Sequence, residues 1–233
     1  MAHRLSLRGI LAFGLALASN LALAAQPHAF TATYAVSKDG APLGRATVIL
    51  KPAGNGQWEY SKHMQGTSGL AAMLGANLAE TSRFRWDGDV PEAISYDYRM
   101  EASIKTKQRH LAVDWASHQV TVDEGKGVQT YAAVPGMVER NTTALAIGLA
   151  LRNGQHRIEL PVAVRQEIEH QQFEVTGTEK VGVPAGSYDA VRVDRTDADR
   201  GFSAWYVPDR YPLPVKLSQK DGGDLTMELV SFQ

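Results

Sequence analysis

A recurring alternation of apolar and polar residues is the feature that most limits the folds open to this chain. In residues 94–100 every second residue is apolar, and serine, aspartate and arginine lie between them. The same period of two recurs at residues 30–36, 46–50, 111–115 and 225–229. Turn sequences such as Lys38-Asp39-Gly40 separate these segments. Such alternation predicts antiparallel strands with one buried face.

Composition excludes several function classes. The 24 Lys and Arg residues nearly balance 25 Asp and Glu residues, so the chain lacks the basic excess of a nucleic-acid-binding protein. Without cysteine it cannot form a disulfide scaffold, a thiol nucleophile or a cysteine-containing zinc site. The hydrophobic share of 44% is that of a folded globular protein.

Residues 1–24 have the pattern of a secretory signal peptide. Arg4 and Arg8 precede an uncharged apolar run over residues 10–23, and Ala22-Leu23-Ala24 is a small-x-small cleavage signal. The run is shorter than the roughly 20 residues needed to span a bilayer, which disfavours a membrane anchor. We therefore expect cleavage near Ala24/Ala25 and a periplasmic mature chain, residues 25–233, folded as a single β-rich domain.

Two segments break the alternation and predict helices. Residues 69–79 place apolar residues at helical spacing, and no charged residue occurs from 66 to 79. Residues 141–153 are nearly apolar all round, with Asn141 or Thr142 as a candidate cap and Gly154 directly after. Both helices would have to be covered by other parts of the chain.

The uncharged segment 69–79 has two interpretations. It could be a lid over an apolar cavity in a curved sheet, a setting in which lipids and other apolar ligands bind. It could equally fill the concave side of the sheet as ordinary core. Under the first interpretation, the candidate ligand-binding residues are Leu70, Met73, Leu74, Leu78, Trp86 and Tyr98.

Motifs for catalysis or metal binding are absent from the sequence. It has no G-x-S-x-G, Ser-x-x-Lys, H-E-x-x-H or P-loop motif. His110 and His118 are close in sequence, but Asp114 is the only further ligand nearby, so surface histidines are favoured over a metal site. We predict no catalytic residue, no metal and no cofactor.

Lys105, Lys107 and Arg109 share one parity and form a basic stripe. The stripe could meet anionic headgroups. A solvated strand face, or an edge protected by lysine, explains it as well.

The C-terminal third carries three sequence blocks in order. These are V-P-A-G-S-Y at 183–188, A-W-Y-V-P-D at 204–209 and L-P-V-K-L at 213–217. In this order they resemble the DUF3108 family of exported bacterial proteins, over about residues 28–232. The resemblance implies a β-rich periplasmic protein without assigned catalytic residues. It also suggests a likeness in shape to half-open β-barrels of the lipoprotein-carrier type, which is an analogy of fold only.

These observations together predict a mainly β fold. We expect a single curved antiparallel sheet or half-open β-barrel of about ten to twelve strands, with one or two short helices at its mouth. The favoured function is a non-enzymatic envelope protein that binds a lipid or other apolar ligand in the concave face. The alternatives are an envelope protein–protein interaction module and, third, a hydrolase of envelope polymers. Neither nucleic acid nor a stable membrane span is expected.

Overall fold

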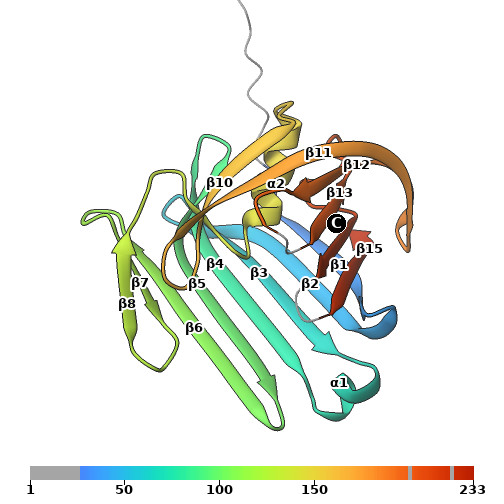
Figure 1. Ribbon diagram of the computed structural model, residues 1–233, viewed down its shortest axis with the longest axis horizontal. Helices are drawn as coiled ribbons and strands as arrows, with labels where there is room; N and C mark the ends of the chain where they lie inside the picture. Colours follow the sequence, from blue (N-terminus) through green and yellow to red (C-terminus); the bar gives the residue numbers. More distant parts are fainter. Residues whose placement is uncertain (1–26, 199–200, 221–222) are drawn as a thin grey trace, which may run out of the picture.

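The computed structural model describes residues 27–198, 201–220 and 223–233, so the predicted signal peptide lies outside the described residues. Within them the chain forms one fifteen-stranded sheet and two short helices, as Figure 1 shows. The sheet is strongly curved and encloses the longer helix. This confirms a mainly β fold with a single unclosed sheet, although with more strands than the turn signals indicated.

The elements follow one another along the chain with short connections. The strands are β1 Phe30–Lys38, β2 Ala41–Gly54, β3 Gln57–Gly66, β4 Asn77–Asp87, β5 Val90–Ala102, β6 Lys105–Asp114, β7 Gln119–Asp123, β8 Val128–Ala132, β9 Val138–Glu139, β10 Arg157–Ala163, β11 Ile168–Val183, β12 Gly186–Arg195, β13 Phe202–Tyr206, β14 Lys216–Lys220 and β15 Asp224–Phe232. The helices are α1 Gly69–Met73 and α2 Thr143–Arg152.

Strand order shows how the sheet curls. The order is β8-β7-β6-β5-β4-β3-β2-β1-β15-β14-β13-β12-β11-β10-β9, and every neighbouring pair is antiparallel except β9 and β10. The two ends of this strip meet, because Ala93 of β5 donates a backbone hydrogen bond to Met137, just before β9, at 2.9 Å. A buried cluster that includes Leu111, Val122 and Ala163 joins β6 and β7 to β10 where the ends overlap. Of the two edge strands, β9 is buried and β8 is mostly exposed.

Helix α2 lies inside the curl of the sheet, and Figure 1 shows it between β1–β5 and the arch of β10–β13. Leu145 and Leu149 belong to the buried cluster of β1, β2 and β15. Ala146 and Ile147 belong to a second cluster built by β10–β13. A helix that is apolar all round must be covered on every side, and the curved sheet provides that cover.

The family-like C-terminal blocks hold α2 in place. Tyr206 donates a hydrogen bond from its hydroxyl to the carbonyl oxygen of Ala144 at 3.0 Å, and Arg152 donates to the carbonyl oxygen of Pro208 at 2.7 Å. At Gly148 the helix approaches Pro212 so closely that a Cβ atom there would lie 2.0 Å from the Pro212 carbonyl oxygen. The proline-rich segment is therefore the support against which the helix rests.

Two expectations about local structure are wrong. The predicted helix 69–79 ends at Met73, because Gly75 takes a left-handed conformation (φ 57°) and the chain from Asn77 onward pairs with β3 and β5. The alternation predicted for residues 94–100 does not begin at Ile94. In the β4–β5 pairing Phe84 pairs with Ala93 and Arg83 with Ser95, so the register shifts and Ile94 is left unpaired. Ala93, rather than Ile94, is therefore buried on the inner face.

The close approach of Gly148 to Pro212 generates a prediction. In an ordinary helix Gly→Ala stabilises by about 1 kcal/mol, but Gly148→Ala forces a Cβ into a carbonyl oxygen. We expect Gly148→Ala to lower the free energy of unfolding by about 2 kcal/mol in a urea titration, within the range for overpacked cores. Gly177→Ala is the matched control, because a Cβ at that exposed site meets no atom within 4 Å, and it should change stability by less than about 0.5 kcal/mol. Equal effects of the two variants would contradict the close-packing argument.

Candidate ligand-binding cavity

A cavity of about 560 Å³ occupies the part of the curl beside α2. Its wall comes from β1–β6 on one side and from β10–β15 on the other, and the turn between β10 and β11 contributes residues 164–167. Apolar side chains form much of the wall. Among them are Val48, Met64, Leu78, Phe173, Leu217 and Met227.

A polar row crosses this apolar wall. Strand register aligns Val48, Lys62, Glu80, Tyr98 and Arg109 across β2–β6. Because neighbours in register share a face of the sheet, the charged members of the row lie on the same side as the buried apolar residues. Lys62, Glu80 and Arg109 all line the cavity.

Glu80 is the centre of the first charged group. Its carboxylate forms an ion pair with Lys62 and accepts a hydrogen bond from the Tyr96 hydroxyl at 2.6 Å. Burial by itself raises the pKa of Glu80, but the charge of Lys62 and the hydrogen bonds from Lys62 and Tyr96 outweigh it and hold the pKa below the ordinary carboxyl value. Glu80 is therefore ionised and committed to Lys62 at neutral pH.

Glu139 closes the polar layer at the start of α2. Its carboxylate accepts hydrogen bonds from the backbone N–H groups of Asn141 at 2.8 Å and Thr142 at 3.1 Å, so it satisfies donors that the helix start leaves open. Burial raises the pKa of Glu139, and the charge of Glu80 adds to this, against the opposing hydrogen bonds from Ser82, Asn141 and Thr142. Asn141 in turn donates to the Tyr60 carbonyl at 3.2 Å and the Ser82 hydroxyl at 2.9 Å, which ties the helix start to β3 and β4.

Glu124 is the centre of the second charged group, where the β6–β8 end of the sheet meets the β10–β11 turn. It forms ion pairs with Arg109, at 2.6 Å, and with Arg165. Burial raises the pKa of Glu124, but hydrogen bonds from the two arginines outweigh it and the pKa lies below its usual value. The Tyr131 hydroxyl donates to the Val164 carbonyl at 2.5 Å in the same region. These contacts fasten one side of the cavity wall.

The sequence-predicted site residues separate in the structure. Leu78 lines the cavity. Leu70 and Met73 lie on α1 with 68% and 82% of their surface exposed, and neither is part of the cavity lining. Figure 1 places α1 at the connection between β3 and β4, away from α2. Leu74 caps the end of α1.

Trp86 and Tyr98 occupy two further environments. Trp86 packs edge-on against Phe84 and Trp58, with ring centroids 4.7 and 6.0 Å away. Tyr98 is in register with Glu80, and its pKa is raised by burial and by the Glu80 charge, against the charges of Arg140 and Arg109. The structure therefore places Leu78 in the cavity wall and Tyr98 in the polar row. Trp86 and the α1 residues lie outside the cavity lining.

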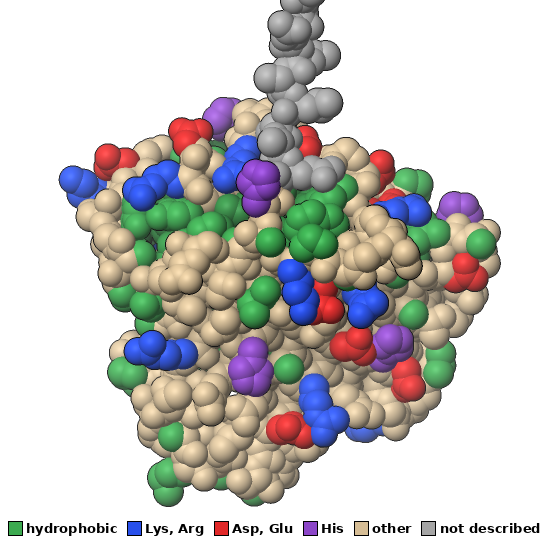
Figure 2. Space-filling view, turned by 180° about the vertical axis from the view of Figure 1, so that it is seen from behind, with side chains coloured by type: hydrophobic (Ala, Val, Ile, Leu, Met, Phe, Trp, Pro, Cys, Tyr) green, Lys and Arg blue, Asp and Glu red, His purple; other side chains and the backbone are tan. Residues whose placement is uncertain are grey.

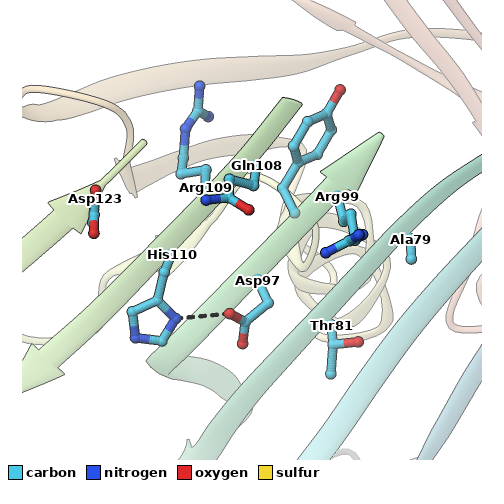
Figure 3. A pocket seen from close by; sticks show the side chains of 9 residues that line it. Ala79, Thr81, Asp97, Arg99, Gln108, Arg109, His110 and Asp123 are labelled. Atoms are coloured by element: carbon cyan, nitrogen blue, oxygen red, sulfur yellow. Dashed lines mark hydrogen bonds and ion pairs between the residues drawn. The ribbon is translucent and has the colours of Figure 1, made fainter. Parts of the chain in front are cut away.

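The other face of β4–β7 carries a shallow depression of about 340 Å³, shown in Figure 3. There the His110 ring nitrogen Nδ1 lies 2.7 Å from Asp97 Oδ1, and both side chains are more than half exposed. Arg109 leaves its strand on the side opposite to this pair. The three residues of the predicted basic stripe therefore lie in different environments. Lys105 and Lys107 are exposed, whereas Arg109 forms an ion pair with Glu124.

The described ranges contain no group of three or more His, Asp or Glu side chains that could hold a metal ion. Instead of meeting His110, His118 packs edge-on against Trp115 at a centroid distance of 6.4 Å.

No helix in the part of the chain that the structure describes is long and apolar enough to cross a membrane. The molecular surface in Figure 2 shows acidic and basic side chains interspersed rather than gathered by sign.

Sequence reasoning missed the charged residues of the polar row. Lys62 and Glu80 have the parity of the buried residues in their strands, which are Tyr60 in β3 and Phe84 in β4. A charge at an inward position was the available signal, because buried charges are rare unless they are paired.

Fold and cavity together define a β-barrel-like protein whose single sheet stays open around a helix and a ligand-sized space. The chain belongs to the DUF3108 family, described as "Protein of unknown function (DUF3108)", whose model matches residues 29–230. Comparison with curated proteins found no match. Among solved structures, the chain is similar to a crystal structure of a β-barrel-like protein of the domain of unknown function DUF1849 from Brucella abortus, with a TM-score of 0.59 and 9% identity over 90% of this chain and 98% of that chain. At this identity the likeness shows the fold alone.

The Lys62–Glu80 pair generates a prediction with a defined pH dependence. The pKa of Glu80 is lowered in the folded state, so the stability that its ionised form contributes is present above the unfolded carboxyl value of about 4.3 and is lost as pH falls through the folded pKa. Glu80→Gln should lower the free energy of unfolding by about 3 kcal/mol at pH 7, because Lys62 then lacks its partner. The difference from wild type should shrink below about pH 4.

Urea titrations at several pH values measure this difference. Glu101→Gln is the control, because Glu101 pairs with Arg99 on an exposed surface and should cost less than about 1 kcal/mol. A difference for Glu80→Gln that does not change between neutral and acid pH would contradict the assignment.

Proposed function

We propose that this protein is a non-enzymatic periplasmic protein that binds a lipid or another ligand with a large apolar part inside the curved sheet. The observation that carries the proposal is the cavity of about 560 Å³ beside α2. Its volume falls in the range of about 300–1,000 Å³ that small-molecule sites occupy, and its wall combines apolar and polar side chains in about equal measure. The strands that form it belong to one continuous ladder of backbone hydrogen bonds.

The use of the carboxylates supports a non-enzymatic role. Glu80 and Glu124 are each committed to cations that keep their pKa low, whereas a general acid or base near neutral pH needs a raised pKa. The pKa of Glu139 is raised, but this group is buried beneath the helix start and its oxygens accept the Asn141 and Thr142 N–H groups. These contacts support structural roles for Glu80, Glu124 and Glu139.

An exposed sheet edge favours a second candidate function, an envelope protein–protein interaction module. Strand β8 is the outermost strand and pairs only with β7 among the described strands. Its first residue, Val128, is 62% exposed. An extended segment of another protein could add to such an edge. Crosslinking from a photoreactive residue at position 128 in intact cells would capture this partner.

Matched leucine variants test the cavity. Leu78 lines it and Leu70 does not, so Leu78→Asp should weaken binding of the uncharged fluorescent probe N-phenyl-1-naphthylamine by about tenfold or more, because an apolar ligand would have to desolvate the new carboxylate. Leu70→Asp should bind the probe as the wild type does. Fluorescence titration measures both, and thermal unfolding checks that both variants fold. Equal affinities for the two variants would refute the cavity as the binding site, and weaker binding by Leu70→Asp alone would favour a lid role for α1.

The predicted signal peptide is tested by the mass of the protein recovered from the periplasmic fraction. Cleavage at the Ala22-Leu23-Ala24 signal should give a chain that begins at Ala25 or Gln26. Intact-mass spectrometry distinguishes this product from the uncleaved chain. A full-length protein that remains with the membrane fraction would contradict periplasmic location.

A further inference from the structure

Four of the six cations that line the cavity pair with carboxylates among the described residues, and they are Lys62, Arg109, Arg165 and Arg195. The other two are Lys220, an exposed residue at the end of β14, and Arg140. Arg140 lies between β9 and α2, its side chain is exposed, and it is part of the cavity lining. Within the described residues, no carboxylate lies within ion-pair distance of its guanidinium, and no hydrogen bond from it is found. A guanidinium that borders a partly enclosed space without an ion-pair partner can bind an anion.

Two carboxylates at or beside the cavity are already committed to other cations. Glu80, whose pKa the charge of Arg140 helps to lower, pairs with Lys62. Glu124 pairs with both Arg109 and Arg165. Over the described lining as a whole, six Lys and Arg side chains face three Glu side chains. The positive excess acts in a partly enclosed space where water screens charge less than at an open surface, so the cavity favours negative charge.

The apolar wall determines the rest of the ligand. Met64, Leu78, Leu217 and Met227 line the same space as Arg140. A ligand that fills it would place an apolar body against these side chains and a charged group at the guanidinium. A small polar anion would leave the apolar wall uncovered, and a neutral hydrocarbon would leave Arg140 without a partner.

We propose that the cavity binds an amphiphile with an acidic head, a carboxylate or a phosphate, and that Arg140 is the residue that holds the head. This inference rests on the proposed function and adds the chemical class of the ligand to it. The planar guanidinium can donate two parallel hydrogen bonds to either head. Fatty acids and phosphate-bearing lipids share this chemistry, and the experiment below separates them.

Ligands that share one dodecyl chain and differ only in the head test the proposal. Dodecanoate, dodecyl phosphate, dodecanol and dodecyltrimethylammonium are titrated into the mature protein by calorimetry below their micellar concentrations. The acidic ligands should bind about tenfold or more tightly than dodecanol, the expected gain from hydrogen bonds to a charged group. A preference for dodecyl phosphate would indicate a phosphate-bearing lipid, and a preference for dodecanoate a fatty acid.

Variants then locate the head. Arg140→Gln should reduce the ratio of acidic-ligand to dodecanol affinity to about one, because the charged partner is removed. Arg140→Lys should keep part of the ratio, since it keeps the charge but loses the paired donors. Arg157→Gln is the charge-matched control, because Arg157 is 86% exposed and pairs with Glu174 away from the cavity lining, and it should leave the ratio at the wild-type value.

The outcomes separate this inference from the proposed function. Dodecanol that binds as tightly as the acidic ligands, a preference for the cationic ligand, or a ratio that survives Arg140→Gln would each overturn the acidic-head assignment while the cavity remains a binding site. Failure of every dodecyl ligand to bind would overturn the proposed function itself. If Arg140→Gln does not fold, salt provides the test on the wild type, because the ratio should fall as added salt screens the guanidinium and a constant ratio would refute the assignment.

Discussion

Burial of a helix that is apolar on every side is the constraint on which the rest of this structure depends. Residues such as Leu145 and Ile147 belong to different core clusters, so α2 needs cover from opposite directions at once. A flat sheet could cover one face only. The strip of strands therefore curls around the helix, and the backbone contact between Gly148 and Pro212 sets how deeply the helix sits. The proline-rich segment near the C-terminus is best understood as the part of the fold that supports α2.

The polar interior is a second consequence of this arrangement. The helix fills only part of the curl, and its first turn carries backbone donors that need acceptors. Glu139 supplies them and Asn141 connects the same turn to β3 and β4. Beyond this layer the wall combines apolar side chains with charged ones, among them the row that contains Lys62 and Glu80. The protein thus places a hydrogen-bonded polar layer beside a space where Arg140 has no ion-pair partner in the described chain.

The sequence predicted more of the fold than of the candidate site. The period-two pattern identified the strands because one buried face imposes it on each strand separately, and the C-terminal blocks identified the family. It failed at two places where tertiary structure outweighs the local pattern. Gly75 ends α1, so Leu78 belongs to strand β4 instead of a helix. In β5 an unpaired residue places Ala93 on the inner face. The cavity was out of reach for another reason. Lys62 and Arg140 line one cavity but come from segments far apart along the chain. No pattern within a single segment could therefore predict that they lie close together.

The seam between β5 and β9 has a mechanical consequence. In a closed barrel the number of strands and their stagger fix the diameter, so the interior cannot widen unless ladder hydrogen bonds break. Here the ends of the strip overlap, and β9 contributes only two residues to the ladder. The overlap is held by side-chain packing and a few contacts such as that from Ala93 to Met137. The inner radius of the sheet can therefore change by sliding at this one seam, while the hydrogen bonds of the long central ladders stay intact.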